Sequence, residues 1–346
     1  MFFRVFLVIC ITVGLFSCSA PKKGEELKDK GVVNLYSQRH YDVDRMVYDK
    51  FEKETGIKVN VISAGADELL AKLENEAELT SCDLFLAVDA GNLYKAKQSG
   101  LLQPVSSEIL NKNIAGQLRD PQGYWYGQTM RARVIAVKKG LKTNYPELDY
   151  KDLALPVFKG KILSRSSSSS YNQALLAAII AHYGEETAFT WAKAVKDNFA
   201  REPRGNDRDQ VKDIAAGLGE VALINTYYLG KMQKSDDPAE QKALAEIEII
   251  FPGQSGFGTH INLSGAGVAK YARNRENAIK LLEFLAREDI QTEFALNNEE
   301  YPVGNKFVSK GILAQLGSFK ADSLNLELLG KYNAAAVTIF DRVGWK

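Results

Sequence analysis

Tyrosine is the residue type whose positions in this chain point most directly to binding chemistry. The sequence holds 15 tyrosines, and several stand where a strand is expected to end or a helix to begin. The candidate site residues of this kind, with one neighbouring histidine, are His40, Tyr41, Tyr171, Tyr227 and Tyr228. Phenol rings at the rim of a cleft stack on sugars and amines, so a binding protein for such a solute is one hypothesis.

The adjacent pair Tyr227-Tyr228 restricts the local structure. Successive side chains of a strand point to opposite faces, so the two tyrosines can share one ligand only from a turn or from the first residues of a helix. The polar pair Asn225-Thr226 comes directly before them and follows the apolar run Gly219 to Ile224. The sequence therefore predicts a buried strand, a short turn and then the two tyrosines.

A run of five serines, Ser166 to Ser170, stands directly before Tyr171 and the apolar segment that continues to Tyr183. Serine hydroxyls and the unpaired N–H groups of a helix N-terminus bind an anion or cap the helix, and the alternative is a flexible loop. The run also raises the hypothesis of a secreted serine hydrolase. However, the chain has no GxSxG motif, and no histidine stands at a recognisable spacing to act as the base.

Several other kinds of chemistry are not favoured by the sequence. It contains no Walker-type GxxxxGK[ST] loop and no HExxH motif, and its three histidines, His40, His182 and His260, are far apart. Three cysteines are too few for a disulfide framework or a structural zinc site, and Cys82 is predicted to be a small core residue. The 44 basic and 43 acidic residues nearly cancel, which disfavours general nucleic-acid binding.

The N-terminus has the pattern of an export signal. A short basic lead is followed by an apolar run that ends near Phe16, too short to span a bilayer, so residues 1–17 are predicted to be a signal peptide. The stretch Leu15 to Cys18 resembles a bacterial lipobox, which predicts lipidation of Cys18 and a polar tether over residues 18–30. The alternative is a plain secretory signal with an incidental cysteine.

The segments that must position the tyrosines alternate in type. Predicted strands cover residues 32–36, 57–62 and 83–88, and predicted helices cover residues 44–55 and 67–78. This order is typical of an α/β fold with a mostly parallel sheet, in which ligands bind outside the carboxyl ends of the strands.

A second unit follows, as the length of 346 residues suggests at about 150 residues per domain. Its predicted strands cover residues 133–137, 219–224 and 248–251, and its predicted helices cover residues 171–183 and 275–286. The strand at residues 133–137 is expected to link the two units.

The chain contains, in this order, the runs VVNLYSQRHYDVD, SAGADELLAKLENE, DLFLAVDAGNLYKAKQSGLLQP, RARVIAV and INTYYLGKM. In their order and spacing it resembles the ferric-iron-binding substrate-binding proteins of bacterial ABC transporters. The resemblance implies a two-lobed, transferrin-like fold of the type II periplasmic binding proteins, with the ligand in the interlobe cleft. It implies an N-terminal lobe of residues 31–133 plus about 258–308, and a C-terminal lobe of residues 134–257 plus about 309–346.

The same resemblance implies a ligand set for ferric iron. Tyr41 would come from the first lobe, and Tyr171, Tyr227 and Tyr228 from the second. One branch of the family uses His, Glu and two tyrosines with a bound anion, but here Val88 stands at the Glu position and Tyr41 and Tyr171 are additional. The chain is therefore similar to the tyrosine-rich branch, and a ligand role for His40 stays open.

Ferric iron suits this donor set. It is a small, hard cation that favours anionic oxygen donors, and a nearby trivalent ion favours the phenolate over the phenol. Soft metals such as copper would favour Cys or Met instead.

Arg131 is the predicted contact for an anion, with a surface salt bridge as the alternative. Four phenolates around Fe³⁺ leave one negative charge, which one arginine balances without an added anion. Three phenolates would leave room for a carbonate-like ion.

The resemblance also implies partners and location. The protein would be a monomeric, lipid-anchored binding protein on the outer face of a bacterial membrane that passes iron to a permease and its ATPase, and it would not be an enzyme. Two alternatives stay open: the same fold binding a polyamine, thiamine or an oxyanion, and the serine hydrolase named above.

Overall fold

The computed structural model of the chain describes residues 31–141, 148–304 and 311–346. The predicted signal peptide, the lipidation site Cys18 and the tether to residue 30 therefore lie outside the described residues. No helix within the described ranges is long and apolar enough to cross a membrane.

One sheet runs through the molecule in the order β2-β1-β3-β8-β4-β6-β5, with β7 and β9 also paired to β4. Its strands are β1 (Val32–Ser37), β2 (Lys58–Ser63), β3 (Leu84–Ala87), β4 (Tyr126–Lys138), β5 (Ile162–Leu163), β6 (Val221–Asn225), β7 (Ile247–Ile250), β8 (Ile261–Val268) and β9 (Tyr301–Pro302).

The sheet is mixed rather than mostly parallel as the sequence predicted. β1 is parallel to β2 and β3, and β5 is parallel to β6, but β8 is antiparallel to both β3 and β4, and β4 is antiparallel to β6. The difference arises because β4 and β8 carry the chain between the two halves of the molecule in opposite directions.

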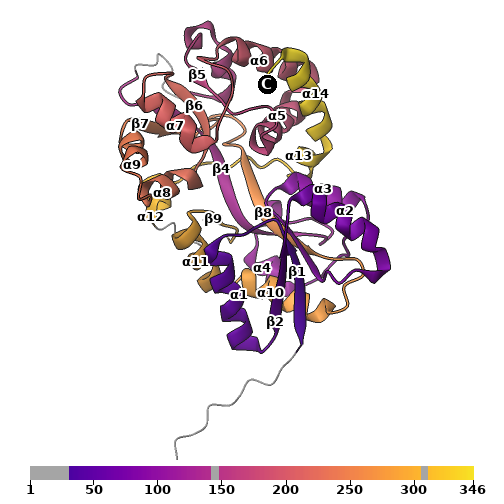
Figure 1. The fold of residues 1–346 in the computed structure, drawn as a ribbon. Helices are drawn as coiled ribbons and strands as arrows, with labels where there is room; N and C mark the ends of the chain where they lie inside the picture. Colours follow the sequence, from indigo (N-terminus) through magenta and orange to yellow (C-terminus); the bar gives the residue numbers. More distant parts are fainter. Residues whose placement is uncertain (1–30, 142–147, 305–310) are drawn as a thin grey trace, which may run out of the picture.

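The long strand β4 belongs to both halves. Its residues Thr129 to Ala132 pair with β8, and Arg133 to Val137 pair with β6. Figure 1 shows two lobes joined by β4 and β8, which confirms the predicted two-lobed α/β architecture. We call the part with β1, β2, β3 and β9 the N-terminal lobe and the part with β5, β6 and β7 the C-terminal lobe.

Six α-helices among the described residues pack on the N-terminal part of the sheet: α1 (Asp42–Thr55), α2 (Ala66–Glu76), α3 (Ala90–Gln98), α4 (Glu108–Asn113), α10 (Arg275–Leu285) and α11 (Glu288–Asn298). Helix α1 ends at Gly56, whose φ of 74° is in the left-handed region that glycine adopts without a Cβ penalty. Asp89 caps α3 by accepting a hydrogen bond from the Gly91 N–H. This cap fixes the start of α3 at Ala90.

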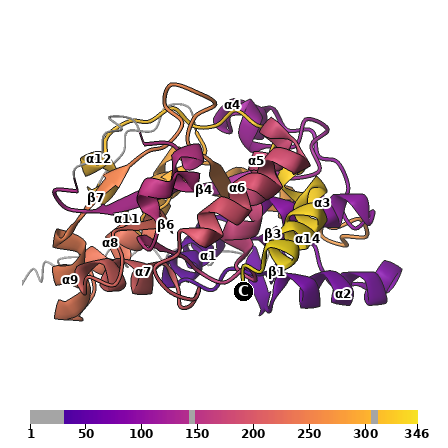
Figure 2. The ribbon, with the colours of Figure 1, turned by 90° about the horizontal axis from the view of Figure 1, so that it is seen from above.

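The remaining α-helices of the described ranges are α5 (Ser170–Tyr183), α6 (Glu185–Asp197), α7 (Asp207–Ala215), α8 (Tyr227–Gln233), α9 (Pro238–Ala245), α12 (Gly311–Gln315), α13 (Glu327–Lys331) and α14 (Asn333–Val343). Helices α5, α6 and α14 lie side by side in the C-terminal lobe (Figure 2). Helix α13 contacts both α3 of the N-terminal lobe and α5 of the C-terminal lobe.

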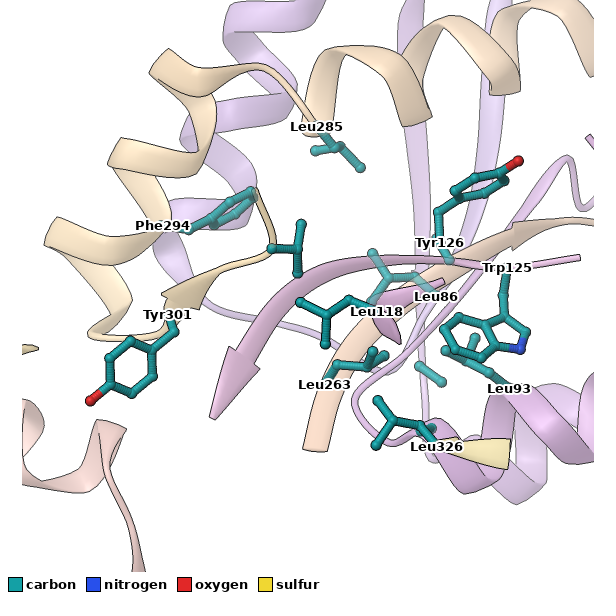
Figure 3. Close-up of a cluster of buried hydrophobic side chains, with 14 of the residues drawn as sticks. Leu86, Leu93, Leu118, Trp125, Tyr126, Leu263, Leu285, Phe294, Tyr301 and Leu326 are labelled. Carbon is teal, nitrogen blue, oxygen red and sulfur yellow. The ribbon is translucent and has the colours of Figure 1, made fainter. Parts of the chain in front are cut away.

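Two clusters of buried apolar side chains fill the molecule. The larger one fills the N-terminal lobe, follows the crossing strands and continues into the C-terminal lobe beside α7 and α8, and Figure 3 shows Leu86, Trp125 and Leu263 within it. The smaller one lies between the C-terminal strands and helices α5, α6 and α14. Cys82 is fully buried in the larger cluster, as the sequence predicted for a small core residue.

Candidate ligand site between the lobes

Each of the four candidate tyrosines stands at the start of a helix. Tyr41 immediately precedes α1, Tyr171 is the second residue of α5, and Tyr227 and Tyr228 are the first two residues of α8. The adjacent pair thus begins a helix, one of the two arrangements that the sequence allowed for a shared ligand.

The structure brings these tyrosines together from both lobes. The Tyr171 and Tyr227 hydroxyl oxygens lie 2.9 Å apart, and the rings of Tyr227 and Tyr228 have centroids 4.2 Å apart. The ammonium of Lys231 lies 4.2 Å from the Tyr41 ring centroid and 5.1 Å from the Tyr227 ring centroid, so Tyr41 faces the same space from the N-terminal lobe.

Burial favours the protonated form of Tyr41 and Tyr227 in the absence of a cation, because it raises the pKa of both. It raises the pKa of Tyr227 well above its ordinary value, and the neighbouring Tyr171 and Tyr228 raise it further. Burial also raises the pKa of Tyr41, where the carboxylate of Glu300 adds to the effect and the Arg39 guanidinium opposes it. A ligand with high positive charge would therefore be needed to ionise the cluster at neutral pH.

His40 lies at the edge of this cluster. Its side chain is exposed, and its ring centroid lies 5.4 Å from that of Tyr41. The structure thus places His40 beside the candidate ligands without burying it among them.

Arg131 and Arg133 behave differently, although both are buried. Arg133 donates from Nη1 to Asp207 Oδ2 at 2.7 Å and from Nη2 to Asn172 Oδ1 at 3.0 Å, so both of its terminal nitrogens have a partner. Arg131 has only a long contact of 3.9 Å to Asp89, and its Nη2 has no hydrogen-bond partner among the described residues. The Arg131 guanidinium lies 5.4 Å from the Tyr171 ring centroid, so this cation is close to the tyrosines, while its Nη2 is the atom that faces Asp89.

The serine run is an ordered loop rather than a flexible one. The Asn172 side chain donates to the carbonyls of Arg165 and Ser166, and the Gln173 side chain donates to the carbonyl of Ser167. Ser169 precedes α5 but makes no side-chain cap, and its buried hydroxyl has no hydrogen-bond partner among the described residues.

Sequence reasoning missed the buried charges that support the tyrosines. Arg39 donates to Asp44 and Glu300, both at 2.9 Å, and its guanidinium lies 4.9 Å from the Tyr41 ring centroid. Asp207 accepts hydrogen bonds from Arg133 and Arg165 at 2.7 and 3.1 Å. No local sequence pattern indicated the pairs Arg39–Glu300 and Arg133–Asp207, because their members are far apart in the chain.

His182, near the end of α5, is paired with an acidic residue and not with the serine run. His182 Nε2 lies 2.7 Å from Asp322 Oδ2. Within the described residues, no group of three or more His, Cys, Asp or Glu side chains is arranged to hold a metal ion.

The sequence of this chain matches a protein-family model. The model described as bacterial extracellular solute-binding protein matches residues 80–316 of the chain. The chain belongs to this family. The resemblance to substrate-binding proteins that the sequence runs indicated is thereby confirmed.

Relatives of this extracellular solute-binding protein cover nearly all of it. Iron uptake protein A1 of Synechocystis sp. is 47% identical over 316 residues, which are 91% of this chain and 87% of the relative. The solved structure of Trichodesmium IdiA (FutA) in complex with iron and citrate ligands is 46% identical, has a TM-score of 0.88, and is matched over 91% of this chain and 100% of that chain. The ferric binding protein from Campylobacter jejuni is 39% identical with a TM-score of 0.84, again over 91% and 100% of the two chains.

Proposed function

We propose that this protein captures ferric iron between its lobes through the phenolates of Tyr41, Tyr171, Tyr227 and Tyr228. The observation that carries the proposal is the convergence of phenol groups from both lobes. The Tyr171 and Tyr227 hydroxyl oxygens of the C-terminal lobe lie 2.9 Å apart, and Lys231 lies over the rings of both Tyr227 and Tyr41. The iron in the names of the relatives supports the same cargo. For His40, whose ring centroid lies 5.4 Å from that of Tyr41, the ligand role considered from the sequence stays open.

Iron must displace protons to bind at this site. Because burial raises the pKa of Tyr41 and Tyr227, their phenols hold their protons until a trivalent cation stabilises the phenolates. Iron binding then becomes weaker as the pH falls, since protons compete for the same oxygens.

Arg131 is the proposed anion contact. Its position beside Tyr171 and its Nη2, which makes no hydrogen bond among the described residues, support this role, whereas Arg133 is held by Asp207. Four phenolates need only one such cation to balance Fe³⁺, so iron binding should not require added bicarbonate. A strict requirement for bicarbonate would indicate fewer phenolate ligands and a carbonate ion in the site.

The iron would then pass to a membrane permease and its ATPase, with lipidated Cys18 holding the monomeric protein at the membrane. We propose the same lobe limits as the sequence suggested: residues 31–133 plus about 258–308, and residues 134–257 plus about 309–346. The protein would act by a hinge motion in which lobe closure assembles the ligand set.

The test uses the visible spectrum and the metal content of the purified protein loaded with ferric citrate. Phenolate-to-iron charge transfer should colour the protein. Metal analysis should find about one iron per chain. Replacing both Tyr227 and Tyr228 by Phe keeps the rings but removes two donor oxygens, so colour and tight binding should be lost. Tyr41→Phe should weaken binding less, because one proposed bond is lost.

The matched control is Tyr271→Phe, at a partly exposed tyrosine outside the cluster, which should leave both readouts unchanged. A double variant that keeps its colour and affinity would contradict the iron site. A colourless wild-type protein that a polyamine, thiamine or an oxyanion stabilises would favour the same fold with a different solute.

A further inference from the structure

Helix α8 carries more than the two tyrosines at its start. Lys231 and Lys234 follow Tyr227 by four and seven residues, which places all three on one face of the helix. This face is turned toward the N-terminal lobe, because Lys231 lies over the Tyr41 ring and Lys234 reaches the end of α11.

Glu299 meets this face from the N-terminal lobe. It directly follows α11, it has a φ of 58° in the left-handed region, and it is only 3% exposed. Its side chain lies against Gly230 of α8, where an added Cβ would sit 2.1 Å from Glu299 Cγ. Only glycine permits such a close approach, so the two lobes touch here through the backbone of α8.

Two groups of opposite charge, one from each lobe, meet at this contact. The Lys234 ammonium forms an ion pair with the Glu299 carboxylate and donates a hydrogen bond of 2.6 Å to the Leu296 carbonyl. A carboxylate is buried at an acceptable cost only when a cation accompanies it. Among the described residues, Glu299 Oε2 has no hydrogen-bond partner, so the charge of this carboxylate is offset chiefly by Lys234.

We propose that Gly230, Lys234 and Glu299 form a clasp that holds the lobes closed and positions the Tyr227-Tyr228 pair opposite Tyr41. The inference rests on the proposed function, because iron is the cargo whose retention the clasp controls. The clasp residues are positioning residues and donate no ligand atom. Loss of the clasp should therefore speed iron release without changing the ligands.

The test measures the rate at which the iron-loaded full chain loses iron to excess EDTA, its visible spectrum, and the radius of gyration of the iron-free protein by small-angle scattering. Gly230→Ala should raise the release rate more than about tenfold, because the new methyl group overlaps Glu299. Lys234→Met should raise the rate about two- to fivefold, the range expected for a half-exposed ion pair. In both variants the absorption maximum should stay in place and the radius of gyration should rise.

Two further variants separate the clasp from general effects. Lys234→Arg keeps the charge and should restore slow release. Lys193→Met removes another exposed ion pair of the C-terminal lobe, the 3.5 Å contact to Asp197 on α6, and should change nothing.

Unchanged release rates in both Gly230→Ala and Lys234→Met would overturn the clasp, as would a shifted absorption maximum or an equal effect of Lys193→Met. Absence of the absorption band from the wild-type protein would overturn the iron proposal instead. In that case the scattering comparison of iron-free proteins still decides whether the clasp holds the lobes together.

Discussion

At the scale of single residues, Asp207 organises the cations behind the tyrosines. It is fully buried and accepts hydrogen bonds from Arg133, Arg165 and the Asn225 N–H at 2.7, 3.1 and 2.7 Å. The guanidinium groups of Arg133 and Arg165 lie 5.8 and 4.9 Å from the Tyr171 ring centroid. One carboxylate thus fixes two cations and one backbone donor beside the candidate site.

Replacing Asp207 by Ala should lower the free energy of unfolding by about 3–5 kcal/mol, because the buried guanidinium of Arg133 and the partly buried one of Arg165 lose their counter-charge. Urea unfolding of the iron-free protein measures the change. Asp341→Ala, at an exposed position of α14, is the control and should stay within about 0.5 kcal/mol of the wild type. Equal stability of the two variants would mean that the arginines find other partners.

The sequence predicted the candidate tyrosines but not the buried ion pairs beside them. Tyr227-Tyr228 is a local pattern, since its neighbours alone indicate a turn after a strand. The pairs Arg133–Asp207 and Arg39–Glu300 join residues separated by 74 and 261 positions, so no local pattern indicates them. Such pairs become visible only once the topology brings their strands and loops together.

At the scale of elements, the two crossing strands are tied together at one point. The Tyr150 hydroxyl donates to the Arg133 carbonyl of β4 and accepts a hydrogen bond of 3.2 Å from the N–H of His260, directly before β8. His260 is buried here, and burial lowers its pKa to about 3, with Arg133 and Arg131 adding to the shift.

The iron-free protein should therefore lose stability in mild acid. His260 stays neutral in the folded state but takes up a proton below about pH 6.5 when the chain is unfolded, so its contribution is present above that pH and is lost as the pH falls toward 3. Between pH 6.5 and 5 this amounts to about 2 kcal/mol at one pKa unit per 1.36 kcal/mol. Urea unfolding at several pH values should show this slope.

His260→Gln should remove that share of the pH dependence, because glutamine does not titrate. His40→Gln, at an exposed histidine, should leave the slope as it is in the wild type. A slope that is the same in all three proteins would assign the acid sensitivity to other groups.

Segments with a clear apolar run were predicted well, and strands of two residues were not. Helix α5 and strands β1 and β3 lie within one or two residues of their predicted limits, because their apolar runs are bounded by polar or glycine residues. Strands β5 and β9 have two residues each, too few for any periodicity. Strand β4 begins seven residues before its predicted start, since polar residues such as Gln128 and Arg131 are buried between the lobes there.

At the scale of the whole molecule, the proposed lipid anchor depends on Cys18, which lies outside the described ranges. Cys18→Ala should prevent lipidation and move the protein from the membrane fraction to the soluble extracytoplasmic fraction, which immunoblotting of fractionated cells measures. The Cys82→Ala variant is the control, because that cysteine is buried in the core and should not affect fractionation. Unchanged fractionation of the Cys18 variant in cells that process lipoproteins would favour the plain secretory signal.

The place of β8 between β3 and β4 also has a consequence for how the chain reaches its folded state. The sheet of the N-terminal lobe lacks the strand between β3 and β4 until residues 261–268 are available. Synthesis must therefore be about three-quarters complete before this lobe can finish folding. Contacts between such distant segments form slowly, because the intervening chain must first be brought together. The predicted signal peptide would direct this chain across a membrane. Late folding would favour that passage, since a lobe that folded early would obstruct the transport of an unfolded chain.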